Sequence, residues 1–225
     1  MIGPLVLAAA LAAPVPVYVA LGDSTGAGEG ARLGGYPERL AAALAAEVRP
    51  VRLVNLCVSG ARLGDLLRRQ LRRGVEASPA LVTVGIGIND VLQETGPAGF
   101  ARDLEVLGEA LAASGAGVVI VNVPDLSRSP RAMGGVELER LRERVGAFNA
   151  ALAALAARRG FALADLHAAG APAYGAPGTL SDDLFHPSDE GYRRWAEAIL
   201  PVVRRALSGR GGPGGARLPA DGGVR

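Results

Sequence analysis

The sequence predicts an α/β fold in which a parallel sheet carries helices on both faces. Short apolar runs rich in β-branched residues alternate with longer segments whose apolar residues recur at helical spacing. Such alternation is typical of parallel sheets, because their strands are buried on both sides. The chain has 225 residues, 49% of them apolar, and a single cysteine, so it can bury a core without disulfides. We therefore expect one domain.

Five strands are expected, and several end at a clear turn signal. The first strand, residues 15–21, runs into Gly-Asp-Ser, and the fourth, residues 118–123, is closed by Pro124. The other strands are expected at residues 51–56, 80–86 and 161–166.

Helices are expected between these strands. Residues 37–48 begin with a proline, which suits the first turn of a helix. Ser188 can cap the last helix, residues 188–207, because its side chain can accept from a free backbone N–H. The other helices are expected at residues 63–73, 100–113 and 136–155.

The formal charge of +2 is confined to the end of the chain. Residues 209–225 carry three arginines and one aspartate, which accounts for the whole charge and leaves the rest neutral. A neutral body is a poor nucleic-acid reader, so no nucleic-acid partner is expected. We expect residues 15–208 to form the domain and the Gly-rich residues 209–225 to be disordered.

Residues 1–14 form an apolar leader or a short signal segment. Prolines interrupt the apolar run, so no transmembrane span is expected. No basic residue precedes that run, as one would in a signal peptide, so export and a cytoplasmic location both stay open.

The loops that follow the strands hold the residues suited to catalysis, since ligands of parallel α/β sheets bind beyond the carboxyl ends of the strands. Ser24 lies where the first strand gives way to a Gly-rich turn, which can expose its hydroxyl and its backbone N–H. Gly60 follows the second strand and Asn89 the third. A backbone N–H and a side-chain amide are donor types of an oxyanion hole, so these residues predict a site that stabilises a tetrahedral intermediate.

A serine nucleophile needs a general base, and the chain has two histidines. His186 follows Asp182 and Asp183 closely enough for a carboxylate to hold its Nδ1–H. His167 lacks such a partner pattern and is interpreted as a solvent-facing or capping residue. The sequence therefore favours His186 as the base.

Four segments together resemble the SGNH/GDSL hydrolase family. They are Gly22-Asp23-Ser24, Gly60, Gly87-x-Asn89-Asp90 and Asp183-x-x-His186-Pro187, in the family's order and within residues 17–196. The resemblance implies a flavodoxin-like, three-layer α/β/α fold with a five-stranded parallel sheet. It also implies a serine hydrolase of carboxylic esters, of the esterase, lipase or thioesterase type, working through an acyl-enzyme on Ser24.

The resemblance also implies roles for individual residues. Ser24 becomes the nucleophile, His186 the base and Asp183 the residue that orients the base. The backbone N–H groups of Ser24 and Gly60 and the side chain of Asn89 become oxyanion donors. No metal or organic cofactor is implied. Thr25 stands where the family signature usually has leucine.

The sequence indicates the substrate less clearly than it indicates the catalytic residues. Neighbours of the four segments predict the pocket walls at Thr25, Ser59, Val91, Asp125 and Leu184. Only 4% of residues are aromatic, which favours a small-molecule ester or lipid over a polysaccharide ester. Acyl length, ester against thioester preference and oligomeric state stay open.

Three alternatives remain at this stage. Residues 22–26 also match G-x-S-x-G, the nucleophile elbow of α/β-hydrolases, although that elbow normally follows a central strand deeper in the chain. Residues 26–30 could hold a phosphate at a helix start, but the chain has no lysine for a Walker A loop. The third alternative is a non-catalytic binding module on the same fold.

Overall fold

The computed structural model describes residues 14–134 and 137–208. Within them, five strands form one parallel sheet in the order β2-β1-β3-β4-β5. The strands are β1 (Val17–Gly22), β2 (Arg52–Asn55), β3 (Leu81–Gly85), β4 (Gly117–Val121) and β5 (Ala162–Ala164). The predicted five-stranded parallel sheet is confirmed. The expected leader, apart from Pro14, and the expected tail lie outside the described residues.

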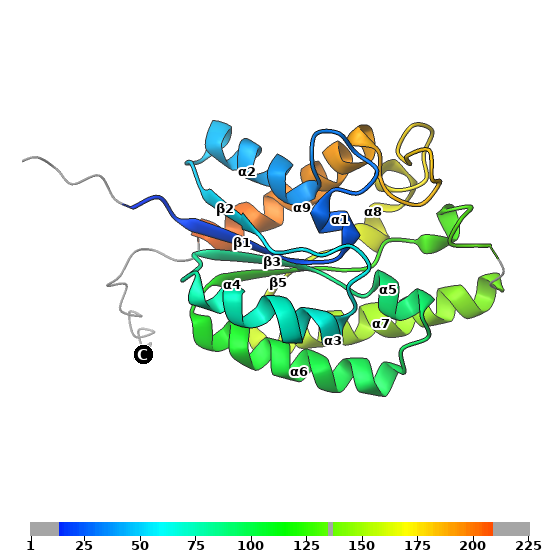
Figure 1. Cartoon of the computed structure of the whole chain (residues 1–225), viewed down its shortest axis with the longest axis horizontal. Helices are drawn as coiled ribbons and strands as arrows, with labels where there is room; N and C mark the ends of the chain where they lie inside the picture. The colour runs from blue at the N-terminus through cyan, green and yellow to red at the C-terminus, as the bar shows by residue number, and fades with distance from the viewer. Residues whose placement is uncertain (1–13, 135–136, 209–225) are drawn as a thin grey trace, which may run out of the picture.

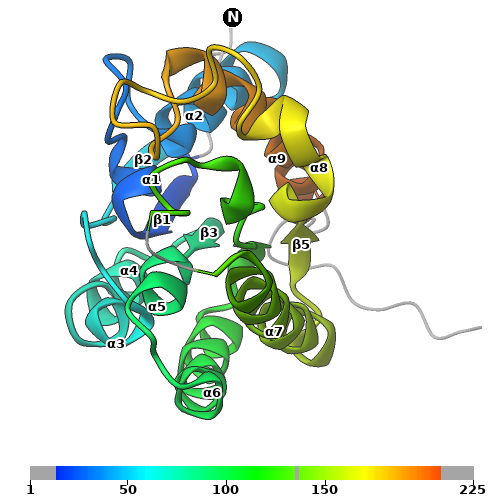
Figure 2. The ribbon, with the colours of Figure 1, turned by 90° about the vertical axis from the view of Figure 1, so that its right-hand side faces the viewer.

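Helices cover both faces of the sheet and make the three predicted layers (Figures 1 and 2). One face carries α1 (Ser24–Ala27), α2 (Tyr36–Glu47), α8 (Leu166–Ala173) and α9 (Asp189–Ser208). The other face carries α3 (Leu63–Leu66), η1 (Leu67–Leu71), α4 (Arg72–Glu76), α5 (Ile88–Leu92), α6 (Pro97–Ser114) and α7 (Leu138–Arg159). A short turn, η2 (Leu126–Arg128), follows β4. Helices α2 and α9 pack on each other above the sheet, and α6 and α7 do so below it.

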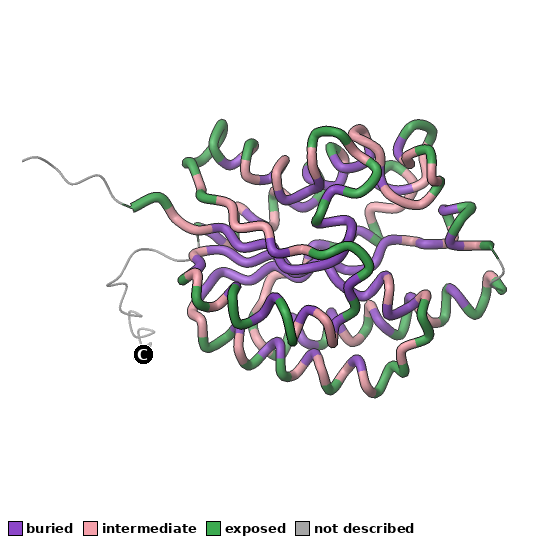
Figure 3. Tube along the Cα trace, viewed as in Figure 1, coloured by how far each residue is buried: buried purple, intermediate pink, exposed green. Residues whose placement is uncertain are grey.

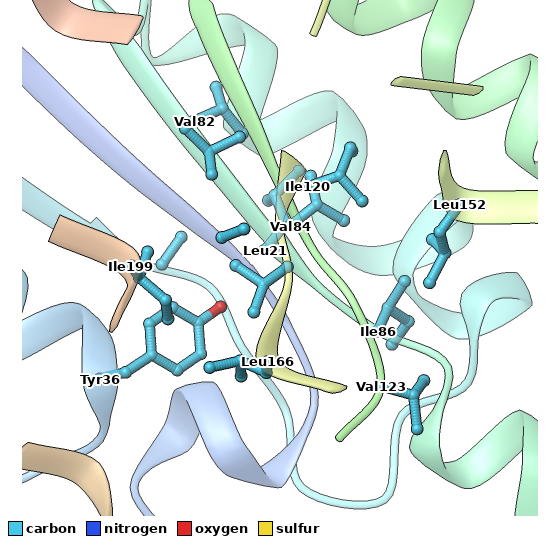
Figure 4. Close-up of a cluster of buried hydrophobic side chains, with 14 of the residues drawn as sticks. Leu21, Tyr36, Val82, Val84, Ile86, Ile120, Val123, Leu152, Leu166 and Ile199 are labelled. Carbon is cyan, nitrogen blue, oxygen red and sulfur yellow. The ribbon is translucent and has the colours of Figure 1, made fainter. Parts of the chain in front are cut away.

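The core lies on both sides of the sheet. Every residue of β3 and β4 is buried, and the buried tube in Figure 3 runs through the strands and the inner faces of the helices. Figure 4 shows side chains from the two helix layers meeting the strands, such as Ile199 of α9 and Leu152 of α7. Phe148 of α7 packs on Phe100 of α6, with ring centroids 4.4 Å apart. Burial of apolar side chains is the main term that holds these layers together.

Helix α9 closes the upper layer with one apolar stripe. Its buried residues recur every three or four positions, as the helical period requires: Tyr192, Trp195, Ala196, Ile199, Val203 and Leu207. The indole Nε1–H of Trp195 donates to the Ala173 carbonyl (2.9 Å), so this buried donor is satisfied. None of the described helices is long and apolar enough to cross a bilayer.

The sheet order places β1 inside the sheet, between β2 and β3. All strands run the same way, so the loops that follow them gather at one edge, which Figure 2 views face on. Within the segment before α9, Leu180 and Pro187 pair in an antiparallel bridge that closes this loop on itself. This edge is where the residues singled out in the sequence come together.

Some elements differ from the expectations. The expected helix at residues 63–73 runs on to Glu76 and contains one turn of π-helix, η1. The first strand begins at Val17, two residues later than expected. Three short helices, α1, α5 and α8, were missed, because segments of four to eight residues are too short to show a helical period.

Candidate active site

Ser24, His186 and Asp183 form one hydrogen-bonded chain at this edge. The Ser24 hydroxyl lies 2.9 Å from Nε2 of His186. Nδ1 of the same ring lies 2.6 Å from Oδ2 of Asp183. A ring that donates from Nδ1 to a carboxylate presents an unprotonated Nε2 to the hydroxyl, which is the tautomer a general base needs. The structure thus brings together three residues that the sequence singled out.

The turn from β1 into α1 sets the position of Ser24. A Cβ on Gly22 would lie 2.3 Å from the Gly85 carbonyl oxygen, so only glycine lets the two strands approach so closely. Asp23 caps α1, and its Oδ1 accepts from the backbone N–H (3.0 Å) and the hydroxyl (2.8 Å) of Thr25. Ser24 is the first residue of α1, and its own N–H donates to no acceptor in the described residues.

Gln70 supports this turn from the opposite layer. Its side-chain amide accepts from Gly22 N (2.9 Å) and donates to Gly22 O (2.8 Å), and the side chain is buried. Gln70 belongs to η1, the π-helical turn. Gln70 was not among the site residues expected from the sequence. Its signal was a polar residue that falls on the apolar stripe of the helix, three and four positions after Leu67 and Leu66.

In the loop before α9, the Asp183 carboxylate accepts several hydrogen bonds and fixes the position of His186. Oδ1 of Asp183 accepts from the Ser181 hydroxyl (2.8 Å) and from the backbone N–H groups of Phe185 and His186 (2.9 Å each). Partial burial opposes ionisation of this carboxyl, but its hydrogen bonds outweigh that cost and hold the pKa of Asp183 well below its usual range. The carboxylate therefore stays charged and keeps the imidazole in one orientation.

The predicted oxyanion donors lie beside Ser24. Gly60 adopts a left-handed backbone conformation (φ 76°), and its N–H, like that of Ser24, has no acceptor among the described residues. The Asn89 amide donates one N–H to the Ala61 carbonyl (3.0 Å) and carries a second. The next residue, Asp90, accepts from Leu63 N (3.0 Å), so the loops after β2 and β3 are tied together.

These groups face a cavity of about 430 Å³. Its size is in the range of small-molecule sites, which run from about 300 to about 1,000 Å³. Its wall combines the four predicted groups with apolar and charged side chains: Ser24, Glu29, Ser59, Gly60, Asn89, Leu92, Gln93, Arg131, Ala132, Gly134, Phe185 and His186. A site that joins a serine, a histidine and converging N–H donors in a cavity can carry out acyl transfer.

Comparisons with known proteins agree with this geometry. The sequence profile of the GDSL-like Lipase/Acylhydrolase family matches residues 20–194. The chain belongs to that family. It is 29% identical to Esterase TesA of Pseudomonas aeruginosa over 196 residues, which cover 87% of this chain and 91% of the esterase. The protein is therefore a GDSL carboxylic ester hydrolase.

Solved structures show the same fold. A crystal structure of TesA superposes with a TM-score of 0.71 at 25% identity, covering 84% of the hydrolase and 99% of that chain. The psychrotrophic esterase EstA from Pseudoalteromonas, inhibited by monoethylphosphonate, gives a TM-score of 0.69 at 19% identity over 86% and 99% of the two chains. The lipase/acylhydrolase from Enterococcus faecalis gives 0.67 at 23% identity over 86% and 96%. The SGNH fold implied by the four segments is confirmed, and with it the α/β-hydrolase alternative is rejected.

The pocket walls of the hydrolase differ from the expectation. Of the five predicted wall residues only Ser59 lines the cavity. Thr25 is buried with its hydroxyl turned to Asp23, and Val91 is also buried.

Asp125 accepts from the hydroxyl of Ser127 and lies outside the cavity wall. Leu184 is half exposed beyond that wall, and its neighbour Phe185 lines the cavity instead. Position next to a catalytic segment did not predict which way a side chain points. His167 also lies elsewhere, in α8 after β5, where its backbone N–H donates to Asn122.

Asp23 is the unusual ionisable group of the site. It is buried, and its Oδ2 has no hydrogen-bond partner among the described residues. Burial raises the pKa of Asp23 to about 6, although the hydrogen bonds from Thr25 and the proximity of His186 favour the charged form. In the part of the chain that the structure describes, no three His, Cys, Asp or Glu side chains are grouped as metal ligands.

Proposed function

We propose that the hydrolase cleaves esters by two-step acyl transfer on Ser24. His186 takes the proton from the Ser24 hydroxyl as the oxygen attacks the ester carbonyl. His186 then returns that proton to the departing alcohol, which leaves an acyl-enzyme. Water, deprotonated by the same ring, attacks the acyl-enzyme, and the proton passes back to Ser24 as the acid is released.

One observation carries this proposal, namely the continuous chain from the Ser24 hydroxyl through both nitrogens of His186 to Asp183. Asp183 supports the imidazolium that forms when the ring takes the proton, because its carboxylate is held in the charged form. The oxyanion of each tetrahedral intermediate would be met by the N–H groups of Ser24 and Gly60 and by the Asn89 amide. These donors support the proposal because all three residues line the same cavity.

The substrate we propose is a carboxylic ester or lipid with a short or medium acyl chain. The cavity has a moderate volume and a mixed wall in which Leu92, Ala132 and Phe185 are the apolar side chains. Proteins similar to the hydrolase include ones described as an esterase, a lipase and an acetyl xylan esterase.

The direct test is substitution of the serine. Ser24→Ala should reduce hydrolysis of a short p-nitrophenyl ester to background and abolish labelling by a fluorophosphonate probe. Ser114→Ala is the matched control, since that hydroxyl lies at the end of α6 and donates to the Leu111 carbonyl. An active Ser24→Ala variant, or labelling that persists in it, would refute the assignment of the nucleophile.

A further inference from the structure

Arg131 reaches the proposed catalytic chain from a separate segment, which follows β4. Ser129 anchors this segment to the His186 loop, because its hydroxyl donates to the Leu184 carbonyl (2.6 Å) and accepts from Ala132 N (3.1 Å). The side chain of Arg131 also lines the cavity together with Ser24 and His186. Arg131 was not among the site residues expected from the sequence.

The guanidinium shares an oxygen with the imidazole. Nη1 of Arg131 lies 3.2 Å from Oδ2 of Asp183, the same atom that accepts from Nδ1 of His186 at 2.6 Å. The Arg131 Cζ also lies 5.9 Å from the centroid of the Phe185 ring, close enough for a cation–π contact. Since Oδ2 lies between them, the guanidinium nitrogen and the imidazole nitrogen are at most about 6 Å apart.

A permanent positive charge so close to His186 opposes its protonation. Arginine stays charged at every pH at which the enzyme works. Two positive charges about 6 Å apart repel each other by an amount that corresponds to about 0.5 pKa unit in water, and to more in a less polar surrounding. The guanidinium also partly neutralises the Asp183 carboxylate, whose negative charge would stabilise the imidazolium. The side chain of Arg131 is 62% exposed, so solvent keeps the repulsion near its value in water, and we expect the acidic limb of the pH–rate profile to shift by about 0.5 to 1 pH unit.

We propose that Arg131 is a positioning residue that acts on His186 through Asp183, lowering the basicity of the imidazole and extending hydrolysis to more acidic pH. This inference rests on the proposed catalytic role of His186. The ring must be neutral to take the serine proton, so a less basic ring remains competent at lower pH. The consequence is an acidic limb of the pH–rate profile that depends on the charge at position 131.

Other charged groups surround the catalytic chain and stay the same in every variant. Those that line the adjoining depression with His186 are Glu29, Arg32, Asp182, Asp189 and Glu190. Asp23 lies within electrostatic reach of His186 and titrates in the same pH range. The comparison between two variants at position 131 therefore isolates the effect of that residue. The acidic limb of the pH–rate profile of a single variant would not.

The experiment compares the pH dependence of kcat/KM for wild type, Arg131→Gln and Arg131→Lys. Glutamine keeps hydrogen-bond donors and removes the charge, whereas lysine keeps the charge. We expect the acidic limb to move up by about 0.5 to 1 pH unit in Arg131→Gln and to return toward the wild-type position in Arg131→Lys. Arg72→Gln is the control, because that exposed arginine pairs with Glu76 on α4, before β3 and at the opposite edge of the sheet.

Two outcomes would overturn the proposal. One is an unchanged limb in Arg131→Gln, including a uniform loss of activity at every pH, which would indicate a purely structural contact. The other is a lysine variant that behaves like the glutamine variant. Ser24→Ala separates the two claims, because its inactivity supports the proposed function whatever position 131 does.

Discussion

Replacing Asp23 by asparagine should stabilise the hydrolase relative to wild type increasingly as the pH rises. The wild-type carboxyl is buried, and one of its oxygens lacks a partner among the described residues. Ionisation of such a group is costly, and burial accordingly raises its pKa to about 6. Asparagine keeps an oxygen that can accept from Thr25 and cannot ionise.

The size of the effect follows from the two pKa values. The folded protein holds this proton about two units more tightly than the unfolded chain, whose pKa is near 3.8. The contribution of this proton to the free energy of unfolding is fully present below the pKa of the unfolded chain and is lost as the pH rises through about 6. The full contribution is about 3 kcal/mol. About 2 kcal/mol of that loss falls between about pH 4.5 and about pH 7.5.

The assay is denaturant unfolding of wild type and Asp23→Asn at those two pH values. Other groups titrate too, but Asp90 and Asp183 are common to both proteins, so the difference in unfolding free energy isolates Asp23. That difference should shift in favour of Asp23→Asn by about 2 kcal/mol at the higher pH. A fixed cost of burying the asparagine amide would not change with pH. A difference that is constant with pH, or that moves the other way, would refute the reasoning.

Two further predictions concern catalysis. Asn89→Ala should lower kcat by a factor of about 10² to 10³ while the thermal unfolding midpoint stays close to that of wild type, because it removes one oxyanion donor at a partly exposed site. A kcat within a few-fold of wild type would contradict a role in binding the oxyanion. Across a series of p-nitrophenyl esters, kcat/KM should favour short and medium acyl chains over palmitoyl, since the cavity holds about 430 Å³. Highest activity on palmitoyl would show that the acyl chain binds elsewhere.

Much of the fold could be predicted because its physical signals are local. Short apolar runs marked all five strands, three of them followed by Gly or Pro, and apolar periodicity marked the long helices α6, α7 and α9. Since parallel strands must end at one edge, the loops at Ser24, Gly60 and Asn89 could be expected to meet. The scarcity of histidine then left few candidates for the base.

The pocket walls and the contacts of Gln70 and Arg131 depend on parts of the chain that are far apart in the sequence. The pocket walls were wrong at Thr25, because its hydroxyl satisfies the Asp23 carboxylate and does not face the cavity. Gln70 and Arg131 each form hydrogen bonds with residues more than 45 positions away in the chain, Gly22 and Asp183 respectively. Such pairings are set by tertiary packing, so neither propensity nor spacing could have predicted them.

The hydrogen bond between Ser24 and His186 joins residues that are 162 positions apart. It can therefore form only late in the synthesis of the chain. At about 5 to 20 residues per second, a ribosome adds His186 roughly 10 to 30 seconds after Ser24. During that interval β1 can pair with β2 and β3, while Ser24, the proposed nucleophile, still lacks its proposed base. A nascent or prematurely terminated chain that ends before His186 would therefore carry the proposed nucleophile without its proposed base, and we expect ester hydrolysis to begin only when the last loop and α9 have docked.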